Sequence, residues 1–288
     1  MKFGITFWPA RRKIIVPLAK KADETGFESV WMGEHVVFPS RIETQYPYRD
    51  VDAPLSTTPL YDPIVTFGYL AAVTRRVKLG TSVYVLPLRH PLNVARMLVT
   101  LDALSEGRFL FGVGVGWLRE ELEALGVEYA GRGRRTEEMV TILKRAWSEP
   151  RFAHSGEFFR FPEIGFEPKP VHGSIPILFG GEADAALRRA ARFGDGWIGV
   201  HMPPERVPAI LDKLRRLRAD SELAAQPLEI TVACEGAVPT RALVERYAEV
   251  GVHRLLIEQH LFATPDRRVE GAADNIERFA NDVVAHQS

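Results

Sequence analysis

Short apolar runs alternate with segments of helical periodicity along most of the chain. Eight runs predict buried strands, at residues 2–7, 28–33, 77–85, 108–114, 176–180, 196–200, 229–235 and 253–258. Three of them follow a glycine that closes a helical pattern, namely Gly26, Gly194 and Gly251. Glycine suits the left-handed residue that ends many helices. A helix, a short glycine link and a buried strand, in repetition, are typical of parallel α/β proteins.

The segments between the runs predict helices. Two of them place their apolar residues on one face, the first at Val94, Met97, Leu98, Leu101 and Leu104 and the second at Val207, Ile210, Leu211, Leu214 and Leu217. Asp62 before Pro63 predicts an N-cap followed by proline at the first helical position. Eight strands with matching helices in 288 residues predict a single domain, a (β/α)8 TIM barrel with insertion loops. A doubly wound parallel sheet is the alternative.

Two stretches interrupt the repeat and predict insertions. Residues 36–61 contain four prolines with Tyr46 and Tyr48, and residues 149–176 contain five prolines around the hairpin-like stretch FAHSGEFFRF. Loops of this length in a compact domain are usually functional or disordered, and the aromatic content argues against disorder. We expect the first insertion to cover the mouth of the barrel.

Composition and charge narrow the range of functions. Lys plus Arg and Asp plus Glu number 37 each, so we expect no nucleic acid and no membrane surface as a partner. No apolar run reaches the roughly 20 residues of a membrane span, and the N-terminal stretch is unlike a signal peptide, which predicts a soluble cytoplasmic protein. The single cysteine, Cys234, argues against an internal disulfide. The histidines lack metal-ligand spacing and no Gly-x-Ser-x-Gly elbow occurs, so we expect neither a metal site nor a serine hydrolase.

In a barrel, the residues just past the C-terminal ends of the strands line the active site. Here they are Trp8, Glu34, His35, Ser82, Val83, Tyr84, Gly114, Val115, Gly116, Trp117, Gly180, Gly181, Glu182, Ala183, Val200, His201, Glu235 and Glu258. The set is rich in aromatic residues and glycine and poor in charge. It suits a flat heteroaromatic ring better than a metal ion or a highly charged sugar.

His35 is the candidate acid or base, because histidine exchanges protons near neutral pH. Glu34 precedes it directly, and we expect this carboxylate either to orient another group or to contact a partner strand. We therefore assign both residues to catalysis. The alternative is that His35 is an ordinary loop histidine with satisfied hydrogen bonds.

Two glycine-rich stretches predict binding surfaces. Gly180 and Gly181 end a strand directly before an alanine-rich helix, where backbone amides favour a phosphate group; a tight turn is the alternative. The stretch GVGVGWLREE departs from the dinucleotide fingerprint, since Trp117 stands at its sixth position and it belongs to the fourth strand. We interpret it as glycine-containing backbone that a planar ring can approach closely. We expect Glu120 and Glu121 to face solvent or Arg119.

Several longer stretches carry a resemblance to a known family. RHPLNVARMLVTLDALSEGRFLFGVGVGWLREELEALG, RGRRTEEM, PKPVHGSIPILFGG and ARFGDGWI follow one another along the chain. Together they resemble the luciferase-like flavin-dependent oxidoreductases, and most closely their actinobacterial branch that uses coenzyme F420. The resemblance runs from residue 1 to about 220. It implies a (β/α)8 barrel with insertions and hydride transfer between F420 and a small organic substrate.

The resemblance also implies roles for individual residues. His35 matches the position near the reactive ring carbon, and Ser82–Val83 matches a cis peptide bond that forms a bulge behind the ring. Gly180 and Gly181 match the amides that hold the cofactor phosphate. With the neighbouring strand ends, the expected cofactor site comprises Trp8, Ser82, Val83, Gly114, Val115, Gly116, Gly180, Gly181, Glu182 and Ala183.

The substrate side departs from one branch of the family. Trp117 stands where the sugar-phosphate dehydrogenases carry a glutamate, so we expect an apolar substrate that contacts Trp117, Tyr84 and His201. The arginines of RGRR at 132–135 suggest a contact with the acidic tail of F420, with a solvated helix start as the alternative.

Other functions stay open at this point. An FMN-dependent monooxygenase on the same barrel would use reduced flavin and oxygen, and a separate reductase would supply the reduced cofactor. A non-catalytic barrel that binds flavin as a sensor or store is a further alternative. Barrels of this kind commonly pair through exposed helices, so we expect a homodimer.

Overall fold

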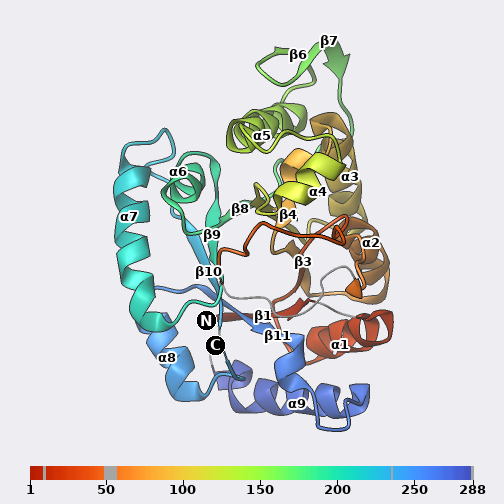
Figure 1. Cartoon of the computed structure of the whole chain (residues 1–288). Helices are drawn as coiled ribbons and strands as arrows, with labels where there is room; N and C mark the ends of the chain where they lie inside the picture. The colour runs from red at the N-terminus through yellow and green to blue at the C-terminus, as the bar shows by residue number, and fades with distance from the viewer. Residues whose placement is uncertain (9–10, 49–56, 235, 287–288) are drawn as a thin grey trace.

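Eight parallel strands close into a barrel (Figure 1). The computed structural model describes residues 1–8, 11–48, 57–234 and 236–286. Neighbouring strands pair in the order β3, β2, β1, β11, β10, β9, β8 and β5, and a pairing between β3 and β5 completes the closure. The strands are β1 Lys2–Phe7, β2 Ser29–Met32, β3 Lys78–Thr81, β5 Phe109–Gly114, β8 Ile177–Gly180, β9 Gly196–Gly199, β10 Glu229–Ala233 and β11 Arg254–Glu258. The predicted (β/α)8 barrel is confirmed.

One predicted strand is divided in two. The run at 77–85 forms β3 and the short strand β4, Tyr84–Val85, which pairs with β5. Ser82 and Val83 separate the two strands, and the peptide bond between them is cis, as the resemblance implied. The run at 229–235 ends as a strand at Ala233, and Glu235 lies outside the described residues.

Helices surround the barrel on its outer side (Figure 1). They are α1 Arg12–Glu24, α2 Pro63–Val73, α3 Pro91–Leu104, α4 Arg119–Ala124, α5 Arg132–Ser148, α6 Asp184–Phe193, α7 Val207–Ala219, α8 Arg241–Glu249 and α9 Val269–Asp282. Short 3-10 turns follow some strands and helices, at η2 Leu86–Leu88, η3 Pro204–Arg206, η4 Gln259–Phe262 and η5 Val284–His286. No helix in the described part of the chain is long and apolar enough to cross a membrane.

The helix patterns hold with one exception. Asp62 caps α2 by accepting a hydrogen bond from the Val65 amide at 3.0 Å, as predicted. Leu104 is 65% exposed, so its assignment to the buried face of α3 is wrong. It is the last residue of that helix.

A tryptophan fills the centre of the barrel. The interior is a separate apolar cluster of Trp31, Leu110, Leu178, Ile198, Ala233 and Leu256, with Val83 packed against it. The ring of Trp31 fits only because nearby strand positions are glycine. A Cβ at Gly80 would lie 2.4 Å from the Trp31 ring, and a Cβ at Gly4 would lie 2.7 Å from its Nε1. Val83 therefore forms the upper layer of a packed interior.

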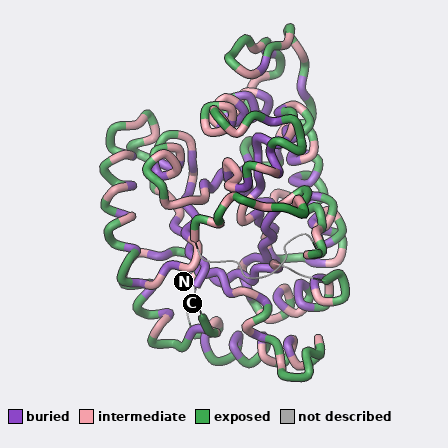
Figure 2. The backbone as a smooth tube through the Cα atoms, viewed as in Figure 1, coloured by how far each residue is buried: buried purple, intermediate pink, exposed green. Residues whose placement is uncertain are grey.

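The two insertions have different structures. Residues 151–165 form an antiparallel hairpin of β6 Arg151–Ser155 and β7 Arg160–Gly165, as FAHSGEFFRF suggested. The hairpin projects beyond α5, far from the barrel strands, and is largely exposed in Figure 2. The first insertion contains no helix longer than a single turn and no strand within its described residues, 36–48 and 57–61.

A pair of glycine substitutions tests the packing of the strands. At Gly112 of β5, an added Cβ would lie 1.7 Å from the carbonyl oxygen of Thr81, so we expect Gly112→Ala to lower the free energy of unfolding by about 3 kcal/mol. At Gly68 inside α2 no atom lies within 4 Å of an added Cβ. Gly68→Ala should therefore stabilise the protein by about 0.5–1 kcal/mol. Urea unfolding measures both; equal effects of the two substitutions would contradict the described packing.

Candidate active site

His35 lies at the end of β2 with both ring nitrogens engaged. Its Nδ1 is 2.7 Å from Oε2 of Glu121, and its Nε2 lies 3.2 Å from Nε1 of Trp117, which donates a hydrogen bond to it. The side chain is only 10% exposed. These two bonds fix the plane of the imidazole at the mouth of the barrel.

Glu121 is buried, contrary to the prediction from the sequence. It is completely buried on α4, and its Oε1 accepts hydrogen bonds from the amides of Val36 at 2.6 Å and Val37 at 3.3 Å. The expectation that it faces solvent is wrong, because the inner face of α4 packs against the turn after β2. Glu120, its neighbour, accepts hydrogen bonds from the amides of Glu43 and Thr44. Both carboxylates therefore hold the first insertion in place.

A sequence signal for this burial exists. Leu118, Glu121 and Leu122 have the spacing i, i+3, i+4, which places all three on one helical face. Leu118 and Leu122 are both fully buried. A carboxylate between two such positions is expected to need a hydrogen-bond partner inside the protein.

Aromatic rings surround the imidazole. Ring centroids lie 4.5 Å from His35 for Phe38 and 5.8 Å for both Trp8 and Trp117. Tyr46, from the first insertion, packs edge-on against Trp117 at 5.1 Å and against Tyr48 at 5.4 Å. The structure thus brings the predicted residues Trp8, His35 and Trp117 together and covers them with the insertion.

Glu34 is bound on the other side of the turn. Its Oε2 accepts a hydrogen bond from the Val85 amide at 2.7 Å, and its Oε1 lies 2.7 Å from Nη2 of Arg89. Burial raises the pKa of the Glu34 carboxyl to about 8, although Arg89 and the Val85 amide act in the opposite direction. Tyr84 is also fully buried, with the Arg89 guanidinium 4.7 Å from its ring centroid. Glu34 and Tyr84 therefore lie behind the wall of the mouth and support it.

The floor of the mouth is formed by Val83 between two glycines. A Cβ at Gly114 would lie 2.4 Å from Cγ2 of Val83, and a Cβ at Gly180 would lie 2.6 Å from its Cγ1. Gly116 has a φ of +78°, and an added Cβ there would lie 2.8 Å from Cγ1 of Val85. The predicted cofactor residues from β3, β5 and β8 thus meet around one valine side chain. The backbone of Ser82, Gly114, Val115 and Gly180 is accordingly kept close to the opening.

The twin-glycine corner lies at the start of α6. Gly181 has a φ of +113°, and an added Cβ would lie 2.9 Å from Ala186 and 3.5 Å from the Tyr48 hydroxyl. Ala183 occupies the N-cap position and provides no side-chain cap. Burial and the charge of Glu182 raise the pKa of the Tyr48 phenol, while a hydrogen bond from the Glu182 backbone lowers it. A single hydroxyl thus lies where helix-start amides would favour an anion.

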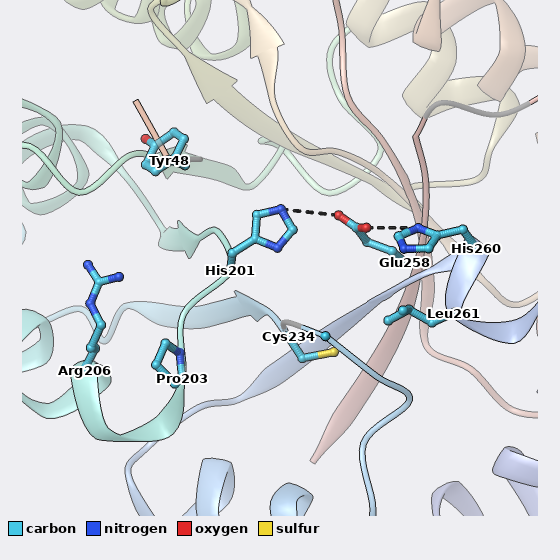
Figure 3. Close-up of a pocket in the computed structure, with 9 residues that line it drawn as sticks. Tyr48, His201, Pro203, Arg206, Cys234, Glu258, His260 and Leu261 are labelled. Carbon is cyan, nitrogen blue, oxygen red and sulfur yellow. Dashed lines mark ion pairs between the residues drawn. The ribbon is translucent and has the colours of Figure 1, made fainter. Parts of the chain in front are cut away.

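A cavity of about 450 Å³ opens beside this corner (Figure 3). Its lining comprises Tyr48, His201, Pro203, Arg206, Cys234, Gly236, Glu258, His260 and Leu261. Glu258 lies between two histidines in Figure 3, with Oε1 3.5 Å from Nε2 of His201 and Oε2 3.1 Å from Nδ1 of His260. Arg206 forms an ion pair with Glu182 at 2.6 Å.

The described residues of the cavity include neither an activated thiol nor a metal centre. Burial and the charge of Glu258 raise the pKa of the Cys234 thiol to about 12, so a thiolate is not formed near neutral pH. Among the described residues, no three or more His, Cys, Asp or Glu side chains are placed to hold a metal ion. His201, predicted to contact substrate, does line the cavity.

The arginines of residues 132–135 are engaged within the protein. Arg132 donates to the Gly116 carbonyl at 3.0 Å and to the Tyr129 hydroxyl at 2.9 Å, and Arg135 donates to the Pro87 carbonyl at 3.2 Å. Arg134 pairs with Glu157 at 2.8 Å. The alternative of a solvated helix start fits Arg134 alone, because Arg132 and Arg135 donate to groups inside the protein. A role toward an acidic tail stays a prediction.

The chain belongs to the luciferase-like monooxygenase family, whose model matches residues 9–282. It is 33% identical over 278 residues to an uncharacterised protein of Mycobacterium tuberculosis, covering 94% of both chains. It is 32% identical over 188 residues to an F420-dependent glucose-6-phosphate dehydrogenase of Kineococcus radiotolerans, covering 64% of this chain and 51% of that protein. It is 34% identical over 155 residues to an FMNH2-dependent dimethylsulfone monooxygenase of Pseudomonas fluorescens, covering 52% of this chain and 42% of that protein.

Solved structures share the fold. The crystal structure of the monooxygenase RslO1 from Streptomyces bottropensis superposes with a TM-score of 0.81 at 24% identity, covering all of both chains. The F420-dependent tetrahydromethanopterin reductase of Methanopyrus kandleri superposes with a TM-score of 0.76 at 16% identity, covering 100% of this chain and 99% of that one. At these identities the match establishes the barrel alone.

The raised pKa of Glu34 predicts a pH-dependent stability. The unfolded carboxyl ionises near its ordinary value of 4.5, whereas the folded one ionises near 8. Its contribution to stability is therefore complete below about pH 4.5 and is lost as the pH rises through 8. Relative to Glu34→Gln, the free energy of unfolding of the wild type should fall by about 1 kcal/mol per pH unit in this window. Urea unfolding at pH 5, 6.5 and 8 measures it; a pH-independent difference would show that Glu34 stays ionised beside Arg89.

Proposed function

We propose that the protein is an oxidoreductase that moves a hydride between coenzyme F420 and a small, mainly apolar organic substrate. The observation that supports this most directly is the hydrogen-bonded His35 under an aromatic cover, which extends through Tyr46 and Tyr48 to a glycine corner suited to phosphate. The family supplies the reaction class, since it contains flavin- and deazaflavin-dependent relatives.

The residues at the mouth fit a tricyclic ring that carries a ribityl phosphate. Gly114 and Gly180 leave room for the Val83 side chain, and a flat ring would lie against this valine. Gly181 and the uncapped start of α6 would hold the phosphate, with Arg206 balancing the charge of Glu182. When bound, the deazaflavin would supply the hydride chemistry.

The protein would supply proton transfer, orientation and shielding from water. In the direction of alcohol oxidation, a proton must leave the substrate oxygen as a hydride leaves carbon, and Nε2 of His35 would accept it. Phe38, Trp8 and Trp117 surround the imidazole ring and would limit the access of water to it. An indole at position 117 offers an apolar surface, which supports an apolar substrate over a sugar phosphate.

An FMN-dependent monooxygenase is the second candidate, because one curated relative uses reduced FMN. The same corner and floor suit either cofactor, since both carry a ribityl phosphate and a tricyclic ring. A reductase that supplies reduced cofactor, a homodimer and a cytoplasmic location stay predictions.

Cofactor titration separates these candidates. Oxidised F420 should quench the fluorescence of Trp8 and Trp117 at low micromolar concentration, whereas FMN should require much more. Gly181→Ala should weaken F420 binding about tenfold or more, since its Cβ would meet Ala186 and its φ is +113°. Gly173→Ala is the matched control, with a φ of +79° and no atom near an added Cβ. Saturable quenching by FMN alone would replace the first proposal by the monooxygenase.

Removal of the imidazole tests the enzymatic role itself. His35→Ala should lower kcat by about 10²–10⁴-fold, with oxidised F420 and any accepted alcohol or with reduced F420 and any accepted ketone, because general acid–base catalysis is lost. His286→Ala, an exposed histidine near the C-terminus, should leave kcat unchanged. Unaltered turnover in His35→Ala would remove His35 from the mechanism. Tight F420 binding without turnover of alcohols, enones or quinones would favour a binding protein.

A further inference from the structure

The hydrogen bonds of His35 determine which nitrogen carries its proton. The indole Nε1–H of Trp117 can only donate, so Nε2 of His35 must accept and carries no proton. A neutral imidazole then has its proton on Nδ1, and this N–H donates to Oε2 of Glu121 at 2.7 Å. The other oxygen of Glu121 already accepts the amides of Val36 and Val37, so the carboxylate acts as acceptor at both oxygens.

We infer that Glu121 is a positioning residue that sets the tautomer of His35 and keeps Nε2 available as a proton acceptor. This inference rests on the proposed function, in which Nε2 exchanges the substrate proton. Glu121 does not touch the substrate; it acts through the imidazole. It would also stabilise the imidazolium that forms, because the Nδ1–H bond to a buried carboxylate strengthens when the ring gains charge.

Trp117 has a complementary part in this arrangement. Its N–H occupies the lone pair of Nε2 that a substrate hydroxyl needs, so the hydroxyl must replace the indole as donor. The ring of Trp117 packs against Tyr46 of the first insertion. Trp117 is therefore a specificity residue: in the direction of alcohol oxidation, a substrate must both pack against the indole and present its O–H to Nε2.

Replacement of Glu121 by glutamine should invert the tautomer. Glutamine has one acceptor and one donor where glutamate has two acceptors. The Val36 and Val37 amides can only donate, so the amide oxygen of the new side chain faces them and its NH2 faces Nδ1. His35 must then accept at Nδ1 and carry its proton on Nε2. Nε2–H would oppose the N–H of Trp117, and the base would be lost.

Nitrogen-15 NMR of the cofactor-free protein tests the inference directly. With ¹⁵N-labelled histidine, long-range proton–nitrogen correlation distinguishes protonated from unprotonated ring nitrogens, and His35→Ala assigns the signals. The wild type should show an unprotonated Nε2 and a protonated Nδ1. Glu121→Gln should exchange the two, and its kcat should fall about 10²–10⁴-fold with little change in KM.

Matched variants distinguish a change of the His35 tautomer from a general disturbance of the structure. Glu120→Gln changes the neighbouring carboxylate, which accepts two amides of the insertion, whereas the His35 ring is bonded to Glu121 and Trp117. It should leave the His35 signals in the wild-type pattern. Trp117→Phe removes the competing donor and keeps an aromatic ring. It should retain protonated Nδ1, because Glu121 remains, and it keeps the inference testable if Glu121→Gln does not fold.

The outcomes are distinct from those of the proposed function. A wild-type protein with protonated Nε2, or a Glu121→Gln protein that retains protonated Nδ1, would overturn the role of Glu121. So would loss of protonated Nδ1 in Trp117→Phe. If the tautomers behave as expected but no F420 binds, the proposed function fails while the Glu121 pairing stands.

Discussion

The indole of Trp31 at the centre of the barrel is the constraint on which the strand arrangement depends. Interior positions of a closed eight-stranded barrel must be filled by side chains, and here one large ring fills much of the space. Glycine at positions 4 and 80 leaves room for it. Above this ring lies Val83, again between two glycines, Gly114 and Gly180. The glycines of the mouth thus make room for Val83 in the same way as the glycines deeper in the barrel make room for Trp31.

Two acidic side chains lie behind the surface of the mouth. Glu34 and Glu121 are both buried, and each binds backbone amides of a neighbouring segment. A buried carboxylate without partners would be costly, so these bonds fix the turn after β2 to β4 on one side and to α4 on the other. His35 lies on this turn, so the bonds of Glu34 and Glu121 determine its position. Aromatic rings form the surface of the mouth, and the polar groups that hold the turn lie behind them.

Much of the fold could be predicted from the sequence, because buried strands and their glycine links leave local patterns. The eight strands, the Asp62 cap and the β6–β7 hairpin all follow from residues close in the chain. The site could be predicted less completely, because its contacts join residues that are far apart in the sequence. The spacing of Leu118, Glu121 and Leu122 could have indicated that Glu121 is buried, but its partners, the turn 85 residues earlier and His35, are visible only in the fold. Trp117 was interpreted as an apolar wall, whereas its N–H donates to Nε2 of His35.

The first insertion joins the two parts of the candidate site. Tyr48 places its hydroxyl 3.5 Å from the position of a Cβ on Gly181, and Tyr46 packs between Tyr48 and Trp117. Trp117 in turn donates to His35. An anion at the amides of Gly181 and Glu182 would compete with the Tyr48 hydroxyl, and a substrate at Nε2 would compete with Trp117. Both ligands would therefore displace contacts of the same short segment, residues 46–48. Binding at the glycine corner and binding at the imidazole would be linked through this segment.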